Sequence, residues 1–191
     1  MSKIQCLTCG GMTDTGDSLT GTCEYCGCAI SLKRISAFSC METADLLKTR
    51  KALEKSDDSE IENRDLALAL CYMKTGNFSL AKKKLEQVMD DSPECCEGYY
   101  YYSIALLNGR RLSDLSLREA RQIAEFLNTA VSLDDSFLFP KLLYALICIE
   151  YYAANDLTPP HDGYAILAEI GSEFNAGEMT FFKGTVKTGL I

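Results

Sequence analysis

The chain has 191 residues, of which 47% are apolar and 24% are charged, a composition typical of a folded globular protein rather than a disordered one. No apolar stretch approaches the length that crosses a bilayer, and the first residues lack the apolar core of a signal peptide. We therefore expect a cytoplasmic protein with no membrane contact. With one histidine and no tryptophan, histidine-based catalysis and histidine-rich metal sites are nearly excluded.

Charge is distributed unevenly along the chain. Residues 1–55 have a net charge of +1, whereas residues 56–191 have a net charge of −9. Because an acidic surface repels a phosphate backbone, nucleic-acid binding by the larger part of the chain is disfavoured. Lys48, Lys51 and Lys55 fall at helical spacing in the first third. A solvated helix face explains this pattern more simply than a phosphate-binding stripe does.

Four of the ten cysteines form two C-x2-C pairs, Cys6 with Cys9 and Cys23 with Cys26, thirteen residues apart. Two intervening residues let one tight turn direct both sulfurs toward a single ion, and the glycine after each pair accepts the positive φ that such a turn uses. Since no secretion signal precedes them, the cysteines favour metal ligation over disulfides.

This spacing resembles a zinc ribbon with rubredoxin-like knuckles, covering about residues 4–30 of a first module that we place at 1–35. The resemblance implies one structural Zn²⁺ ion with four thiolate ligands, namely Cys6, Cys9, Cys23 and Cys26. Iron held by the same thiolates stays an alternative. We expect residues 12–22, between the knuckles, to form a short β-ribbon. Cys28 lies close enough to compete as fourth ligand, but Cys26 completes the two-residue spacing.

The remaining chain is predicted to be helical. Capping boxes begin at Ser39, Ser59 and Ser116, where a serine is followed three residues later by a glutamate. Apolar residues at period two are missing, so no second sheet is expected. A first helix is predicted over 41–55.

Residues 60–93 resemble a tetratricopeptide (TPR) repeat. The residues that match its helix–helix contact positions are Leu68, Ala69, Tyr72, Ala81, Leu85 and Val88. Gly76 supplies a left-handed residue that ends the first helix, and Pro93 closes the unit. Asp65 departs from the pattern because it stands where a bulky aromatic residue is usual.

Two more divergent units follow at 94–135 and 137–175, with a capping helix at 177–187 and a half repeat at 41–55. The resemblance implies a mainly α fold, in which a small N-terminal β zinc ribbon is followed by an α-α superhelix of TPR-like hairpins over 36–191.

Stacked hairpins of this kind leave a groove on their inner helices. By the family's geometry, nine apolar or aromatic side chains face it: Leu66, Leu70, Met73, Tyr100, Ile104, Leu107, Leu142, Leu146 and Ile149. An apolar groove of this size requires a cover. The cover is either the C-terminal helix, through Met179, Phe182 and Val186, or the amphipathic helix of a partner protein.

Other conspicuous side chains have ordinary explanations. Of the four tyrosines at 99–102, two are expected in the core because successive helical residues point to different faces. Cys71 and Cys148 lie on core faces, and no neighbouring cation in the sequence activates Cys95 or Cys96.

We therefore expect a non-enzymatic protein–protein interaction adaptor with a structural zinc site and no small-molecule substrate. Its partner would be another protein, or its own C-terminal helix would occupy the groove. One alternative is a nucleic-acid or transcription-associated zinc-ribbon protein that makes contact through residues 1–55. A second alternative is a thiol or metal sensor that uses Cys28, Cys95 and Cys96.

Overall fold

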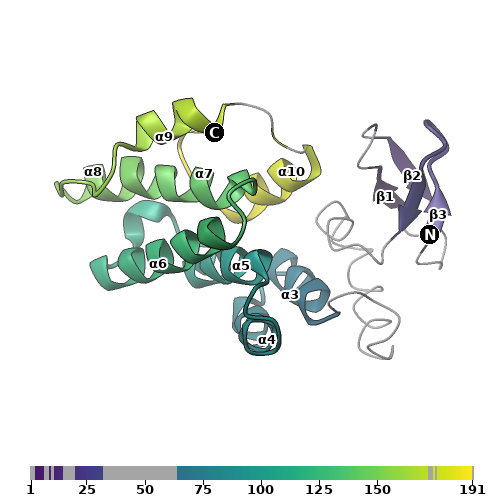
Figure 1. The fold of residues 1–191 in the computed structure, drawn as a ribbon, viewed down its shortest axis with the longest axis horizontal. Helices are drawn as coiled ribbons and strands as arrows, with labels where there is room; N and C mark the ends of the chain where they lie inside the picture. Colours follow the sequence, from purple (N-terminus) through teal and green to yellow (C-terminus); the bar gives the residue numbers. More distant parts are fainter. Residues whose placement is uncertain are drawn as a thin grey trace. The chain divides into compact units, whose positions relative to one another are not determined.

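A computed structural model describes residues 3–6, 9, 11–14, 20–31, 64–171, 174 and 176–190, with short strands near the N-terminus and helices from residue 64 onward (Figure 1). The chain divides into two compact units, one formed by residues 1–84 with 175–182 and the other by residues 85–174 with 183–191. The helix predicted at 41–55, the caps at Ser39 and Ser59 and the module boundary at 35 lie outside the described residues.

The N-terminal strands form two separate antiparallel hairpins. In the first, β1 (Lys3–Gln5) pairs with β2 (Met12–Asp14), and Gln5 lies opposite Met12. In the second, β3 (Thr20–Thr22) pairs with β4 (Ala29–Ser31), and Thr22 lies opposite Ala29. Each C-x2-C pair is therefore carried by the loop of its own hairpin.

This arrangement corrects the β-ribbon predicted for residues 12–22. The two strands within that segment, β2 and β3, belong to different sheets and do not pair with each other. The reason lies in the cysteine loops, where the Cys6 N–H donates to the Gly11 carbonyl and the Cys23 N–H donates to the Cys28 carbonyl, both at 2.8 Å. These bonds close each loop on itself, so each strand pairs across the knuckle.

The first helical hairpin has the predicted turn. Helix α3 (Arg64–Lys74) is followed by α4 (Phe78–Asp91), and Gly76 between them has a φ of 75°. Asp65, which departs from the TPR pattern, makes a 2.9 Å ion pair with Lys84 of α4. This ion pair joins the two helices of the hairpin.

The remaining helices follow in the predicted order. They are α5 (Cys96–Leu107), the short turn η2 (Leu112–Asp114), α6 (Leu117–Leu133), α7 (Leu138–Leu146), η3 (Ile147–Tyr151), α8 (Tyr152–Ala154), α9 (Gly163–Ile170) and α10 (Ala176–Thr185). Helix α6 packs against both α5 and α7, and α7 packs against α9 (Figure 1). The segment η3 is π-helical and joins α7 to α8 without a break. None of the described helices has the length and apolar character needed to cross a bilayer.

Aromatic side chains fill the second unit where α5 meets α6. Tyr100 and Tyr101 are buried, whereas Tyr99 and Tyr102 are half-buried, which confirms that two of the four tyrosines serve the core. The ring of Phe126 on α6 lies 4.9 Å from that of Tyr102. Cys71 and Cys148 are also buried, as expected.

The capping box predicted at Ser116 begins α6. The Ser116 hydroxyl accepts from the Glu119 N–H at 3.3 Å, and the Glu119 carboxylate accepts from the Ser116 N–H at 2.8 Å. The guanidinium of Arg110 lies 2.7 Å from the same carboxylate. The Arg110 and Ser116 hydrogen bonds lower the pKa of Glu119 to about 2.

We predict that Glu119→Ala destabilises the helices by about 1 kcal/mol at pH 7, since solvent screening at this exposed pair limits the gain. Because the pKa of Glu119 is lower in the folded state than its ordinary value of 4.5, its contribution is present above that value and is lost as the pH falls toward 2. Urea unfolding followed by circular dichroism at 222 nm should show the difference from the wild type shrinking between pH 5 and pH 3. Glu125→Ala, on the same helix, is the control; an equal and pH-independent loss in both variants would contradict the assignment.

The close packing of α9 against α7 and η3 depends on Gly163. A Cβ atom at this position would lie 2.6 Å from the Ala145 carbonyl oxygen and 2.6 Å from the Ile149 Cγ1 atom. Because one of these atoms belongs to the backbone, no side-chain rotation relieves the clash.

We predict that Gly163→Ala lowers the free energy of unfolding by about 1–3 kcal/mol, the usual cost of overpacking. Gly184→Ala is the matched control, because a Cβ atom there meets no atom within 4 Å. Urea midpoints of the two variants measure the difference, and equal midpoints would show that the α9 contact is not tight.

Candidate functional site

Five cysteine sulfurs gather between the two hairpin loops. The Cys6 and Cys26 sulfurs are 3.7 Å apart, and those of Cys9 and Cys23 are 3.6 Å apart. Cys28 lies 3.1 Å from Cys6 and 3.3 Å from Cys26, sulfur to sulfur. Among the described residues, the Cys6, Cys23, Cys26 and Cys28 sulfurs all lie within 4.8 Å of one another and could hold a metal ion.

Two of the distances among the four cysteines predicted from spacing match a tetrahedral ion, but the group of sulfurs that all lie within 4.8 Å of one another contains Cys28 in place of Cys9. Zinc–sulfur bonds of about 2.3 Å at tetrahedral angles place two sulfurs about 3.8 Å apart. The Cys6–Cys26 and Cys9–Cys23 distances are within 0.2 Å of this value. The two contacts of Cys28 are shorter, so a set that includes Cys28 requires its sulfurs to move apart.

Backbone amides point at the sulfurs in the same way in both loops. The Gly11 N–H donates to the Cys9 sulfur, and the Cys28 N–H donates to the Cys26 sulfur. The Thr13 hydroxyl donates to the Cys23 sulfur at 3.5 Å and lowers the pKa of that thiol. Donors of this kind offset the charge of thiolates, the form in which cysteine binds metals.

The burial of the sulfurs separates an inner pair from an outer group. Cys6 and Cys23, each the first cysteine of its knuckle, are only 2% exposed. Cys9 and Cys26 are exposed, and Cys28 is half-buried. Four thiolate ligands fill a tetrahedral shell, so this donor set suits a closed structural site with no coordination position open to a substrate. Four thiolates accept zinc or iron alike.

The two-residue spacing disfavoured Cys28 as a ligand, whereas the structure brings its sulfur into the cluster. The overlooked signal is the length of the hairpin loop, because the residue that closes the loop points toward the sulfurs of its own knuckle.

Thiols outside the cluster are poor candidates for sensing. Burial raises the pKa of Cys96 to about 11 and also raises the pKa of Cys95. Both side chains therefore remain protonated at neutral pH, and a protonated thiol is a weak nucleophile. Lys48, Lys51 and Lys55, on which the nucleic-acid alternative rests, lie outside the described residues.

The residues predicted to line a groove are core residues in this structure. Eight of the nine are at most 3% exposed, and only Ile149 is half-buried. In α3, every residue from Leu66 to Met73 is buried, so this helix presents no open apolar face. The apolar pattern identified the buried positions correctly, but these positions do not form an exposed groove. Phe182 and Val186 are buried as well.

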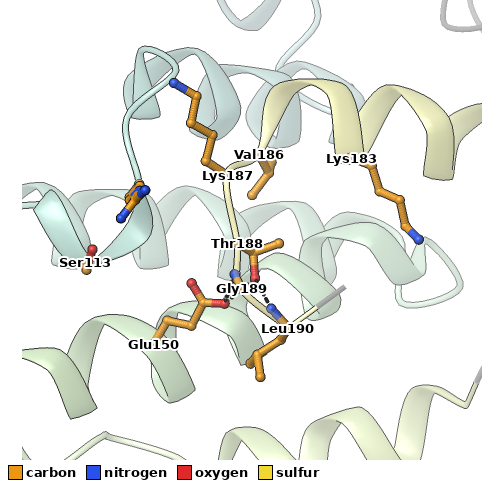
Figure 2. A pocket seen from close by; sticks show the side chains of 9 residues that line it. Ser113, Glu150, Lys183, Val186, Lys187, Thr188, Gly189 and Leu190 are labelled. Carbon is orange, nitrogen blue, oxygen red and sulfur yellow. Dashed lines mark hydrogen bonds between the residues drawn. The ribbon is translucent and has the colours of Figure 1, made fainter.

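A pocket of about 770 Å³ surrounds the C-terminal segment (Figure 2). The Glu150 carboxylate accepts hydrogen bonds from the Thr188 hydroxyl and from the Gly189 N–H, the latter at 2.9 Å. Arg111, Lys183 and Lys187 line the same pocket, and none of them forms an ion pair within the described part of the chain. Figure 2 shows the two lysines extending in different directions, so their charges do not converge on one ligand position.

A second pocket, of about 530 Å³, lies between α6, the helix after it and the loop that precedes α9; we call it the α6 hollow. Its lining combines apolar, aromatic and polar side chains: Leu117, Arg121, Ala124, Glu125, Asn128, Tyr144, Tyr152, Leu157, Thr158, Pro160 and His161. The Tyr144 hydroxyl makes a 2.7 Å hydrogen bond with the Nδ1 atom of His161. Burial raises the pKa of Tyr144 to about 12, so this hydroxyl keeps its proton at neutral pH.

Comparison with family models, with curated proteins and with solved structures found no match to this chain. Its function is therefore inferred from the geometry of its sulfurs and from the packing of its helices.

We predict that Cys23→Ser abolishes metal binding, because Cys23 is buried and its sulfur is already held by Thr13. Metal ligation contributes on the order of 10 kcal/mol or more to folding in small thiolate sites, so the two hairpins should unfold with it. Metal content by mass spectrometry should fall to zero, while ellipticity at 222 nm keeps its helical value. Cys96→Ser is the control and should retain the metal; loss of the helical signal in Cys23→Ser would contradict an independent N-terminal module.

Proposed function

We propose that this chain is a non-enzymatic protein–protein interaction adaptor with one structural zinc ion in its N-terminal hairpins. The observation that carries the proposal is the all-thiol cluster. Four sulfurs complete a tetrahedral shell, which leaves no coordination position for a substrate or an activated water. The ion then stabilises hairpins whose strands are only three residues long.

The helices support an adaptor role of the TPR-like kind. A turn at Gly76 and a capped start at Ser116 divide them into consecutive hairpins, and α6 packs between α5 and α7. Stacks of helical hairpins serve mainly as scaffolds that hold peptides or helices of other proteins. We therefore propose a TPR-like superhelix as the arrangement of this region.

The partner surface that we propose is the α6 hollow, not the nine buried positions. Leu117 and Leu157 at its rim are 38% and 39% exposed. Exposed apolar side chains gathered around aromatic rings and a few polar groups are typical of protein-binding surfaces. Tyr144, Tyr152 and Arg121 add the aromatic and guanidinium groups that dominate binding energy at such surfaces. The expected occupant is a short segment of another protein with apolar side chains.

We predict that Leu157→Asp weakens partner binding by about tenfold or more, because it places a charge in the apolar rim of the hollow. Affinity purification from the native host identifies a partner, which is then purified and titrated against each variant by calorimetry. Leu133→Asp is the matched control, since Leu133 is 43% exposed and does not line the hollow. Equal affinity in both variants would refute the proposed surface, and a purified chain that turns over a substrate would refute the adaptor function.

A further inference from the structure

The two cysteine loops are built alike, which allows their positions to be compared one by one. In each loop the first cysteine donates its N–H to the carbonyl five residues later, at 2.8 Å. The second cysteine accepts from the N–H two residues later in both loops. On this correspondence Cys6 matches Cys23, Cys9 matches Cys26, and the position that closes each loop is Gly11 in one and Cys28 in the other.

Only one loop carries a side chain at the closing position. At Gly11, a Cβ atom would lie 2.5 Å from the ring of Tyr25, an exposed side chain that would have to shift. At the matching position of the second loop stands Cys28, whose sulfur reaches those of Cys6 and Cys26 at 3.1 and 3.3 Å. The second loop thus contributes three thiols to a site that needs two from each loop.

We propose that Cys9 and Cys28 are alternative fourth ligands of one metal site, sharing the three ligands Cys6, Cys23 and Cys26. Each candidate has a different distance in its favour. The Cys9 sulfur lies 3.6 Å from that of Cys23, near the tetrahedral value, whereas Cys28 completes a set whose four sulfurs all lie within 4.8 Å of one another. The two exchanging thiols are the exposed Cys9 and the half-buried Cys28, while the buried Cys6 and Cys23 stay in place.

The exchange conserves atoms and charge. Cys28 releases its thiol proton as its sulfur binds the ion, the bond to the Cys9 sulfur breaks, and the Cys9 thiolate takes up a proton. No electron is transferred and no oxidant is required. The consequence is a site that stays four-coordinate when the exposed Cys9 leaves, so its ion is retained where a site with only four cysteines would lose a ligand.

This inference rests on the zinc site proposed above and is independent of any partner. The test compares Cys9→Ser, Cys28→Ser and the double variant with the wild type, each loaded with Zn²⁺ alone and passed through gel filtration. We expect one equivalent of zinc in the wild type and in each single variant, with dissociation constants within about tenfold of one another. The double variant should bind zinc more weakly than the wild type by more than the roughly 10–100-fold that is lost when only a group hydrogen-bonded to a ligand is changed.

Substitution with Co²⁺ gives a readout that does not depend on stability. Both single variants should show the visible absorption of a tetrahedral four-thiolate site, and the double variant should not. In the zinc-loaded wild type, brief alkylation should place one adduct per molecule within the first 31 residues, on Cys9 in some molecules and on Cys28 in others.

Each outcome has one meaning. Loss of zinc in Cys9→Ser with retention in Cys28→Ser would establish the knuckle set alone and overturn the inference, as would the reverse result, which leaves Cys28 as the only fourth ligand. A wild type that binds no metal would refute the zinc site itself, and with it this inference.

Discussion

The N-terminal hairpins depend on the sulfurs that their loops bring together. Strands of three residues bury too little apolar surface to be stable alone, and a pair of such strands is marginal even when longer. The loop-closing hydrogen bonds of Cys6 and Cys23 fix where the sulfurs point, and a metal ion held by these sulfurs would supply the free energy that packing does not. The loops consequently determine the strand pairing, and not the reverse.

The helical region reaches stability by a different route, through burial and a few close contacts. Its core helices are apolar on nearly every side, as α3 shows. Where α9 packs closely against α7 and η3, the side chain is reduced to a hydrogen atom at Gly163. At the surface, a single carboxylate can be shared by a helix cap and an ion pair, as Glu119 demonstrates.

Features set by local geometry were predictable from the sequence. The left-handed residue at Gly76 and the capping box at Ser116 follow from chemistry within a few residues, and both are present. Three of the four predicted knuckle cysteines, Cys6, Cys23 and Cys26, lie in the cluster for the same reason. Strand pairing across the loops was not, because two short segments of similar composition give no indication of their partners.

Properties that depend on neighbours distant in sequence were also missed. Apolar periodicity shows that Leu66 or Tyr100 faces away from water, but it does not show what covers that face. What covers the predicted groove residues therefore stays a prediction. The α6 hollow escaped notice because its lining comes from a helix, a second helix and a loop, and no single segment carries its signature.

The π-helical segment η3 has a consequence for how this chain can vary in length. The π-helical turn of η3, a wide turn, holds one more residue than an α-helical turn. Every side chain after it is therefore rotated by about 100° from its place in an uninterrupted α-helix. Glu150, within the wide turn, bonds the C-terminal segment, and Tyr152, just after it, lines the α6 hollow. Removal of one residue from this turn would rotate Tyr152 away from its present direction relative to Glu150, so the chain could not keep both attachments.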